Sequence, residues 1–226
     1  MSEKWAVGAM GCRNNDLTSI LVYMDTLESV ESAKYLGCLI SSDLRWTKHI
    51  NSICGKANKT LGFLRRNLNI GSATVKQNAY NSLVRPIVEY VSTVWDPYTQ
   101  NDSHTLEMVH RRGARYVCNR QGNRSSVDSK LDTLKWKSLQ HRRRDARLHM
   151  LYKTYHEDVA ISKEERLIPP ETCIRYISFQ EPSSSSDYRK YSYFPRTIRD
   201  WNSLPTNTAA ATTLVAFKAQ VSQLPH

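Results

Sequence analysis

The spacing of apolar residues after Trp46 constrains the fold of this chain more than any other feature. Successive apolar positions lie three or four residues apart, at Trp46, Ile50, Ile53, Ala57, Leu61, Leu64 and Leu68. This spacing predicts one face of a single helix about 34 Å long. The other face of that helix carries only basic charge, at Lys48, Lys56, Lys59, Arg65 and Arg66. We therefore expect a mainly α fold.

Similar patterns predict further helices. In the second, the inward residues are expected to be Val75, Ala79, Leu83, Ile87, Tyr90 and Val94, and Pro86 should kink or split it. A third, from about Ser103 to Cys118, should turn Leu106, Val109, Gly113 and Val117 inward. A short helix capped by Ser125–Ser126, one over residues 137–157 and one over about 213–223 complete the set, and Ser72 is the expected cap of the second helix.

Two stretches near the N-terminus have strand composition, Ser19–Met24 and Lys34–Ile40. Two strands alone are marginal in water. We therefore expect a short β-hairpin that packs on the helix beginning near Trp46. Ser41, Ser42 and Asp43 offer side-chain oxygens that could cap this helix.

These patterns divide the chain into five parts. Residues 1–18 read as a ragged arm, 19–45 as the hairpin region and 46–157 as a basic helical bundle. Residues 158–190, which are rich in Pro and Ser, read as a flexible linker, and 191–226 as C-terminal helices. In this last part we expect Tyr193–Phe194 to be extended ahead of Pro195. Phe194 and Trp201 should dock on the bundle, with Arg196 bridging to it.

The charge of the chain points to a polyanionic partner. The formal net charge is +11, and residues 101–150 hold 12 Lys/Arg against 5 Asp/Glu. A cluster of this kind favours nucleic acid, although any single cation is more often part of a solvated helix face. Arg111, Arg112 and Arg115 share one arc of their helix and are the better candidates. The Arg142–Arg144 run could contact phosphates or pair with Asp145 or Glu157.

Other classes of site lack support. The five cysteines contain no Cys-x-x-Cys, and the histidines have no metal spacing with them, so we expect buried, reduced thiols in an intracellular protein without metal or cofactor. No apolar run suits a membrane span or a signal peptide. Nucleophile-elbow, phosphate-loop and dinucleotide motifs are missing. His49 should sit at a packing edge.

Eight segments follow one another in a distinctive order and spacing: Ser32–Gly37, Asp43–Ile50, Ala57–Leu68, Tyr80–Pro86, Glu89–Tyr90, Trp95–Tyr98, Leu106–Arg112 and Tyr193–Pro205. These segments resemble the C-terminal part of the reverse transcriptase of LINE-type (Jockey-like) non-LTR retrotransposons. The resemblance spans roughly residues 27–224.

The resemblance implies that Tyr35, Leu36 and Gly37 belong to the primer grip at the end of the palm, and that the helices after them form a thumb-like bundle. It implies that the basic helix faces flank a template–primer duplex. For Tyr35 and Leu36 the alternative is plain packing under the first helix. The candidate nucleic-acid-binding residues are Tyr35, Leu36, Gly37, Lys56, Lys59, Arg65, Arg66, Arg111, Arg112, Arg115, Arg142, Arg143 and Arg147.

The same resemblance argues against catalysis by this chain. Reverse transcriptases hold two metal ions on palm carboxylates that include an Asp-Asp pair, and this sequence has no adjacent aspartates. We expect a catalytically incomplete fragment of an RNA-directed DNA polymerase, nuclear or cytoplasmic, that binds RNA or DNA weakly. Two alternatives stay open: a helical protein–protein interaction module, and a retrotransposon remnant without function.

Overall fold

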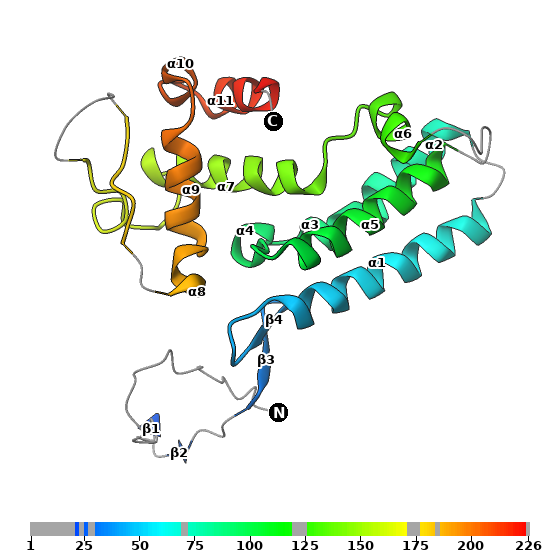
Figure 1. Ribbon diagram of the computed structural model, residues 1–226, viewed down its shortest axis with the longest axis horizontal. Helices are drawn as coiled ribbons and strands as arrows, with labels where there is room; N and C mark the ends of the chain where they lie inside the picture. Colours follow the sequence, from blue (N-terminus) through cyan, green and yellow to red (C-terminus); the bar gives the residue numbers. More distant parts are fainter. Residues whose placement is uncertain are drawn as a thin grey trace.

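The computed structural model describes residues 30–68, 72–118, 126–170, 177–183 and 186–224, together with the backbone at 21–22 and 25–26. The protein is mainly helical and has a short antiparallel hairpin near its N-terminus, as the sequence predicted (Figure 1). None of the helices in these ranges is long and apolar enough to cross a membrane.

The hairpin differs from the predicted one in its strands. β3 (Ser32–Tyr35) pairs with β4 (Cys38–Ser41), and the two are joined by Leu36 and Gly37 at φ +44° and +86°. A two-residue turn with positive φ at both positions matches the twist of a hairpin. The prediction that Lys34–Ile40 forms one strand is therefore wrong. Leu21–Val22 (β1) pairs instead with Asp25–Thr26 (β2), and the rest of Ser19–Met24 lies outside the described residues.

Helix α1 (Thr47–Asn67) follows the predicted pattern and buries Ile50, Ile53, Ala57, Leu61 and Leu64. The predicted capping residues Ser41, Ser42 and Asp43 do not cap this helix, and no other side chain caps its N-terminus. The Asp43 carboxylate accepts the Arg45 N–H, and the Ser41 hydroxyl donates to the Arg45 carbonyl, so both stabilise the turn before the helix.

His49 joins the hairpin to α1. Its Nδ1 lies 3.2 Å from the Leu39 N–H that it accepts, and its ring packs edge-on against Trp95. Burial lowers the pKa of His49, which favours the neutral ring that can accept this bond. The side chain is thus buried and not at a packing edge, and the hairpin packs on α1 as expected.

The second predicted helix is split, as Pro86 led us to expect. It consists of α2 (Ala73–Ala79), a π-helical turn η1 (Tyr80–Val84), α3 (Arg85–Glu89) and α4 (Ser92–Trp95). The Arg85 N–H bonds to the Tyr80 carbonyl five residues back, immediately before Pro86, which has no N–H to donate. Ser72 caps α2 as predicted, through the Val75 N–H.

The predicted inward face of this segment is confirmed only at Ala79 and Ile87, which pack partly buried against the core, and the fully buried stripe lies one residue further along the chain. Tyr80, Val84, Val88 and Trp95 are fully buried. Four residues that were expected inside, Val75, Leu83, Tyr90 and Val94, are about half exposed. The segment is apolar along two neighbouring stripes, and α1 and α5 cover the stripe that contains Tyr80, Val84 and Val88.

Helix α5 (Gln100–Val117) lies beside α1 and closes the first core (Figure 1). All four predicted inward residues, Leu106, Val109, Gly113 and Val117, are buried. Contacts of Asp102 with Thr47 and of Tyr116 with Leu64 show that the two helices run parallel. The short helix α6 (Val127–Thr133) follows, capped by Ser126 as predicted.

Helix α7 (Leu139–Tyr155) spans two cores. Leu139 belongs to the first, whereas Leu148, Leu151 and Tyr152 belong to a second core with the C-terminal helices. Those helices are α8 (Asp187–Lys190), α9 (Tyr193–Asn202), α10 (Thr206–Ala209) and α11 (Leu214–Gln223). Within the predicted linker 158–190, Leu167 and Phe179 are buried in this core.

Phe194 and Trp201 take the predicted position but not the predicted backbone. Trp201 is buried in the second core, and Phe194 packs against it half-buried. Tyr193 and Phe194 are helical and not extended, because Pro195 falls in the first turn of α9, where no N–H needs an acceptor.

Candidate nucleic-acid interface

The exposed side of α1 carries one sign of charge. Five of its exposed residues are cations, at Lys48, Lys56, Lys59, Arg65 and Arg66, and α1 contains no Asp or Glu. Lys48 lies 3.7 Å from the exposed carboxylate of Glu31. For the other four cations, no carboxylate partner is found among the described residues. We call these five residues the cationic face.

The cationic face follows from how α1 packs. Its apolar stripe is taken up by α5, η1 and α3, so the remaining arc must face solvent. Lys56 to Arg66 span about 15 Å along the helix axis. Arg65 and Arg66 also lie in the last turn, where a cation stabilises the helix dipole. Their position therefore has a structural benefit as well as a possible binding role.

Helix α5 extends the cationic face on one side. Arg112 Nη1 donates to the Asn58 side-chain oxygen on α1 at 3.1 Å. The Tyr116 hydroxyl donates to the Leu64 carbonyl at 3.4 Å, which brings the turn that holds exposed Arg115 beside the end of α1. Arg111 lies elsewhere, because it pairs with Asp128 on α6 at 2.6 Å. Two of the three predicted arginines of α5 therefore join the face.

One aromatic side chain on this face escaped the sequence analysis. Phe63 is 54% exposed and lies between Lys59, four residues before it, and Arg66, three residues after it. These spacings put the three side chains on one strip of the helix. The signal was available, because Phe63 is the large apolar residue of α1 that falls outside its inward stripe. An exposed ring among cations is suited to stacking on an unpaired base.

The arginines of α7 form ion pairs with carboxylates of the same chain. Arg142 binds both carboxylate oxygens of Glu89, with Nη2 3.0 Å from Oε2, and this hydrogen bonding raises the pKa of the guanidinium. Arg143 and Arg147 are buried. The expected partners Asp145 and Glu157 are not used by this run, because the carboxylates of Glu89, Asp96 and Asp200 lie closer. The structure therefore separates Arg142, Arg143 and Arg147 from the cationic face.

Three arginines surround the buried carboxylate of Asp96. Arg143 Nε lies 2.7 Å from Oδ1, and Arg147 Nε and Arg196 Nη1 lie 3.0 and 3.2 Å from Oδ2. Burial lowers the pKa of Arg147, and the charge of Asp96 opposes this shift. Arg196 also donates to the carbonyls of Asp96 and Pro97, so it bridges α9 to the bundle as predicted. The network joins α7 and α9 to the residue that follows α4.

The hairpin tip lies apart from most of the cationic face. Tyr35 and Leu36 are 51% and 70% exposed, so they do not pack under α1. The Tyr90 hydroxyl donates to the Leu36 carbonyl at 3.3 Å, and the Tyr90 ring lies against Gly37. The tip thus contacts the residue that follows α3, whereas Lys56 and the cations after it lie between the middle and the C-terminal end of α1.

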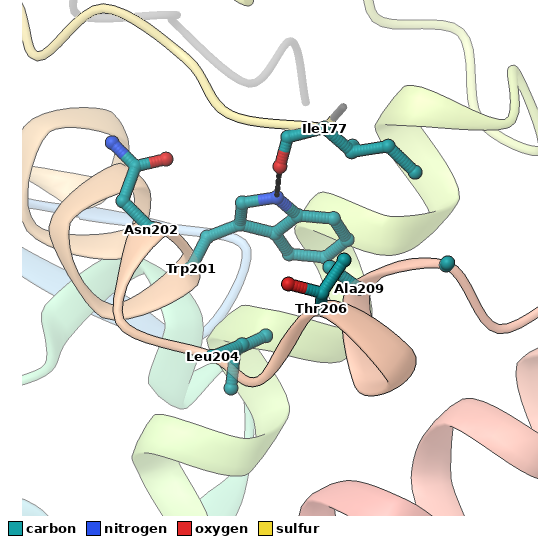
Figure 2. A pocket seen from close by; sticks show the side chains of 7 residues that line it. Ile177, Trp201, Asn202, Leu204, Thr206 and Ala209 are labelled. Atoms are coloured by element: carbon teal, nitrogen blue, oxygen red, sulfur yellow. Dashed lines mark hydrogen bonds between the residues drawn. The ribbon is translucent and has the colours of Figure 1, made fainter. Parts of the chain in front are cut away.

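The hollow beside Trp201 gives no sign of chemistry. Ile177, Leu204, Thr206, Ala209 and Ala210 line it together with Trp201 and Asn202, and none of these can titrate near neutral pH (Figure 2). The indole N–H is bonded to the Ile177 carbonyl at 3.3 Å (Figure 2). The Asn202 side chain exchanges two hydrogen bonds with the Phe179 backbone. These contacts fix the segment before α8 onto α9.

Comparison of the chain with protein-family models, curated proteins and solved structures finds no match.

Proposed function

We propose that this protein binds RNA or DNA through the cationic face of α1, extended by Arg112 and Arg115 of α5. The observation that carries the proposal is an exposed helix arc with five cations and no acidic residue in the whole helix. Phosphate contacts of this kind supply affinity without reading base sequence. Binding should therefore be weak, salt-sensitive and largely independent of sequence.

The resemblance to LINE-type reverse transcriptases supports a more specific form of this proposal. In it, the chain is a catalytically incomplete fragment of such an enzyme, and its helices hold a template–primer in the manner of a thumb. The basic helix α1 is compatible with that arrangement, whereas Tyr35 and Leu36 at the hairpin tip lie apart from most of its cations. The part of the site nearest to a duplex would be Lys56, Lys59, Arg65 and Arg66.

Fluorescence anisotropy with a labelled primer–template tests the binding. If about five phosphates are neutralised, a plot of log K against log salt should have a slope of about −4 to −5. Absence of binding at low salt, or a slope near zero, would refute the proposal. Comparison of duplex with single-stranded probes then shows whether Phe63 favours an unpaired base.

A further inference from the structure

The fully exposed residues of the helices from α2 to α4 carry no charge, and the charged side chains Arg85 and Glu89 of α3 are only partly exposed and pair with each other. Eleven residues between Ser72 and Trp95 are exposed, and none is Asp, Glu, Lys or Arg. The large apolar residues among them are Val75, Leu83, Tyr90, Val91 and Val94. We call these five residues the uncharged face. Its composition is unlike that of α1, where half of the ten exposed residues are cations.

This segment is apolar on two sides, and only one side is covered. Tyr80, Val84, Val88 and Trp95 fill the first core, whereas Val75, Leu83, Tyr90 and Val94 are 47% to 57% exposed. A helix with apolar residues on both sides is normally buried on both. Depletion of charge together with exposed aliphatic and aromatic side chains is the composition of an interface core. The five residues of this face offer no cation to a phosphate, so its composition favours a protein ligand over nucleic acid.

The hairpin tip enlarges the uncharged face. Tyr90 contacts both residues of the turn, through the Leu36 carbonyl and the Gly37 Cα, and so brings Tyr35 and Leu36 next to it. With these two residues added, the exposed side chains present on the order of 700 Å² of accessible surface, close to the ~800 Å² that each partner gives to a standard interface. A stable dimer therefore needs little more area than this face supplies.

From these observations we infer that a second copy of this chain covers the uncharged face, to form a two-fold symmetric dimer. Two-fold symmetry brings a surface against itself, so a charged face would meet like charge, whereas this face does not. None of the cations of α1 belongs to the uncharged face. Their repulsion across a dimer is screened beyond about 8 Å at physiological ionic strength. The inference does not depend on nucleic-acid binding.

Sedimentation equilibrium of the full chain tests the dimer. We expect a dimer at micromolar concentrations for the unmodified protein, and association that is kept or strengthened as salt rises from 0.1 to about 0.5 M, since apolar contact dominates. Nucleic-acid binding has the opposite salt dependence, so failure of either proposal leaves the other testable. Leu83→Asp should shift the protein to monomer with at least a tenfold weaker dimer constant.

Val215→Asp is the matched control. Val215 is a 78% exposed apolar residue on α11, outside the uncharged face, and its substitution should leave the dimer intact. Val75→Asp provides a second variant if Leu83→Asp loses helical circular dichroism. A monomeric unmodified protein at about 100 µM would overturn the inference. The inference would also be overturned if Leu83→Asp and Val75→Asp left the association unchanged. The same holds if the uncharged face bound a different protein and not a second copy of this chain.

Discussion

Gly113 of α5 touches the ring of Tyr80 in η1 so closely that no side chain fits between them. A Cβ atom on Gly113 would lie 2.3 Å from Tyr80 Cε2. The Tyr80 ring cannot easily move, because Trp136 stacks on it at 4.5 Å and its hydroxyl lies 2.9 Å from His110 Nδ1. The contact sets the separation of α5 and the π-turn.

Gly113→Ala should therefore destabilise the protein. Overpacking costs about 1–3 kcal/mol, which exceeds the gain of up to about 1 kcal/mol from higher helix propensity. Gly55→Ala on α1 is the control, because nothing lies within 4 Å of its Cβ position and only the propensity gain applies. Urea denaturation should move the two midpoints in opposite directions. Equal stabilisation by both substitutions would show that the Tyr80 contact is not restrictive.

The buried His110 predicts loss of stability in acid. Burial lowers its pKa to about 4, against about 6.5 in the unfolded chain. Because the folded pKa is the lower one, the unfolded state binds the proton more tightly. The contribution of neutral His110 to the free energy of unfolding is therefore complete above pH 6.5. It decreases as the pH falls and is lost below about pH 4, and the total loss is up to about 3 kcal/mol. Denaturation at several pH values gives the slope of the free energy of unfolding against pH. This slope should be smaller for His110→Gln than for the unmodified protein.

His104 supplies the comparison for that measurement. It lies on the same helix but is exposed, so His104→Gln should keep the slope of the unmodified protein. If His110→Gln does not reduce this slope, the loss of stability in acid comes from other groups. Among them are His49 and His149, whose pKa values burial also lowers.

Removal of the Asp96 charge should strongly reduce the free energy of unfolding. Asp96→Asn leaves buried Arg143 and Arg147 without their shared carboxylate, and breaking such a pair costs about 3–5 kcal/mol. Asp128→Asn removes the exposed partner of Arg111 and should cost less than about 0.5 kcal/mol. Thermal or urea unfolding measures both. Similar costs for the two substitutions would mean that burial of the network contributes little.

The cationic face predicts a specific loss of binding. Lys56→Ala combined with Lys59→Ala should weaken primer–template binding and reduce the magnitude of the salt slope by about 2, one for each phosphate contact. The control removes the same charge elsewhere, with Lys190→Ala and Lys218→Ala on α8 and α11, both exposed. An equal effect of both pairs in anisotropy titrations would indicate that net charge, and not the face of α1, determines binding.

Sequence periodicity predicted the elements that are apolar on one side. The stripes of α1 and α5 lie where their spacing placed them, because each helix has one apolar face and one polar face. The same reasoning missed the face of α2–α4, where two apolar stripes compete and only contact with α1 and α5 selects one. It also treated Lys34–Ile40 as a strand, since positive φ at Leu36 gives no signal in the residue type.

The sequence by itself determined the mainly helical class, the Ser72 and Ser126 caps of α2 and α6, and the accumulation of positive charge. Only the tertiary structure decided which arginines are available. Arg143 and Arg147 look like surface cations in the sequence, yet they meet Asp96 from 47 and 51 residues away and are buried with it. The physical reason is that the residue pattern along one helix gives only the direction in which each side chain points from the helix axis. Whether that side chain is buried depends on which distant elements pack against that side of the helix. The cations of α1 stay exposed because no element with a carboxylate packs over them in the described part of the chain.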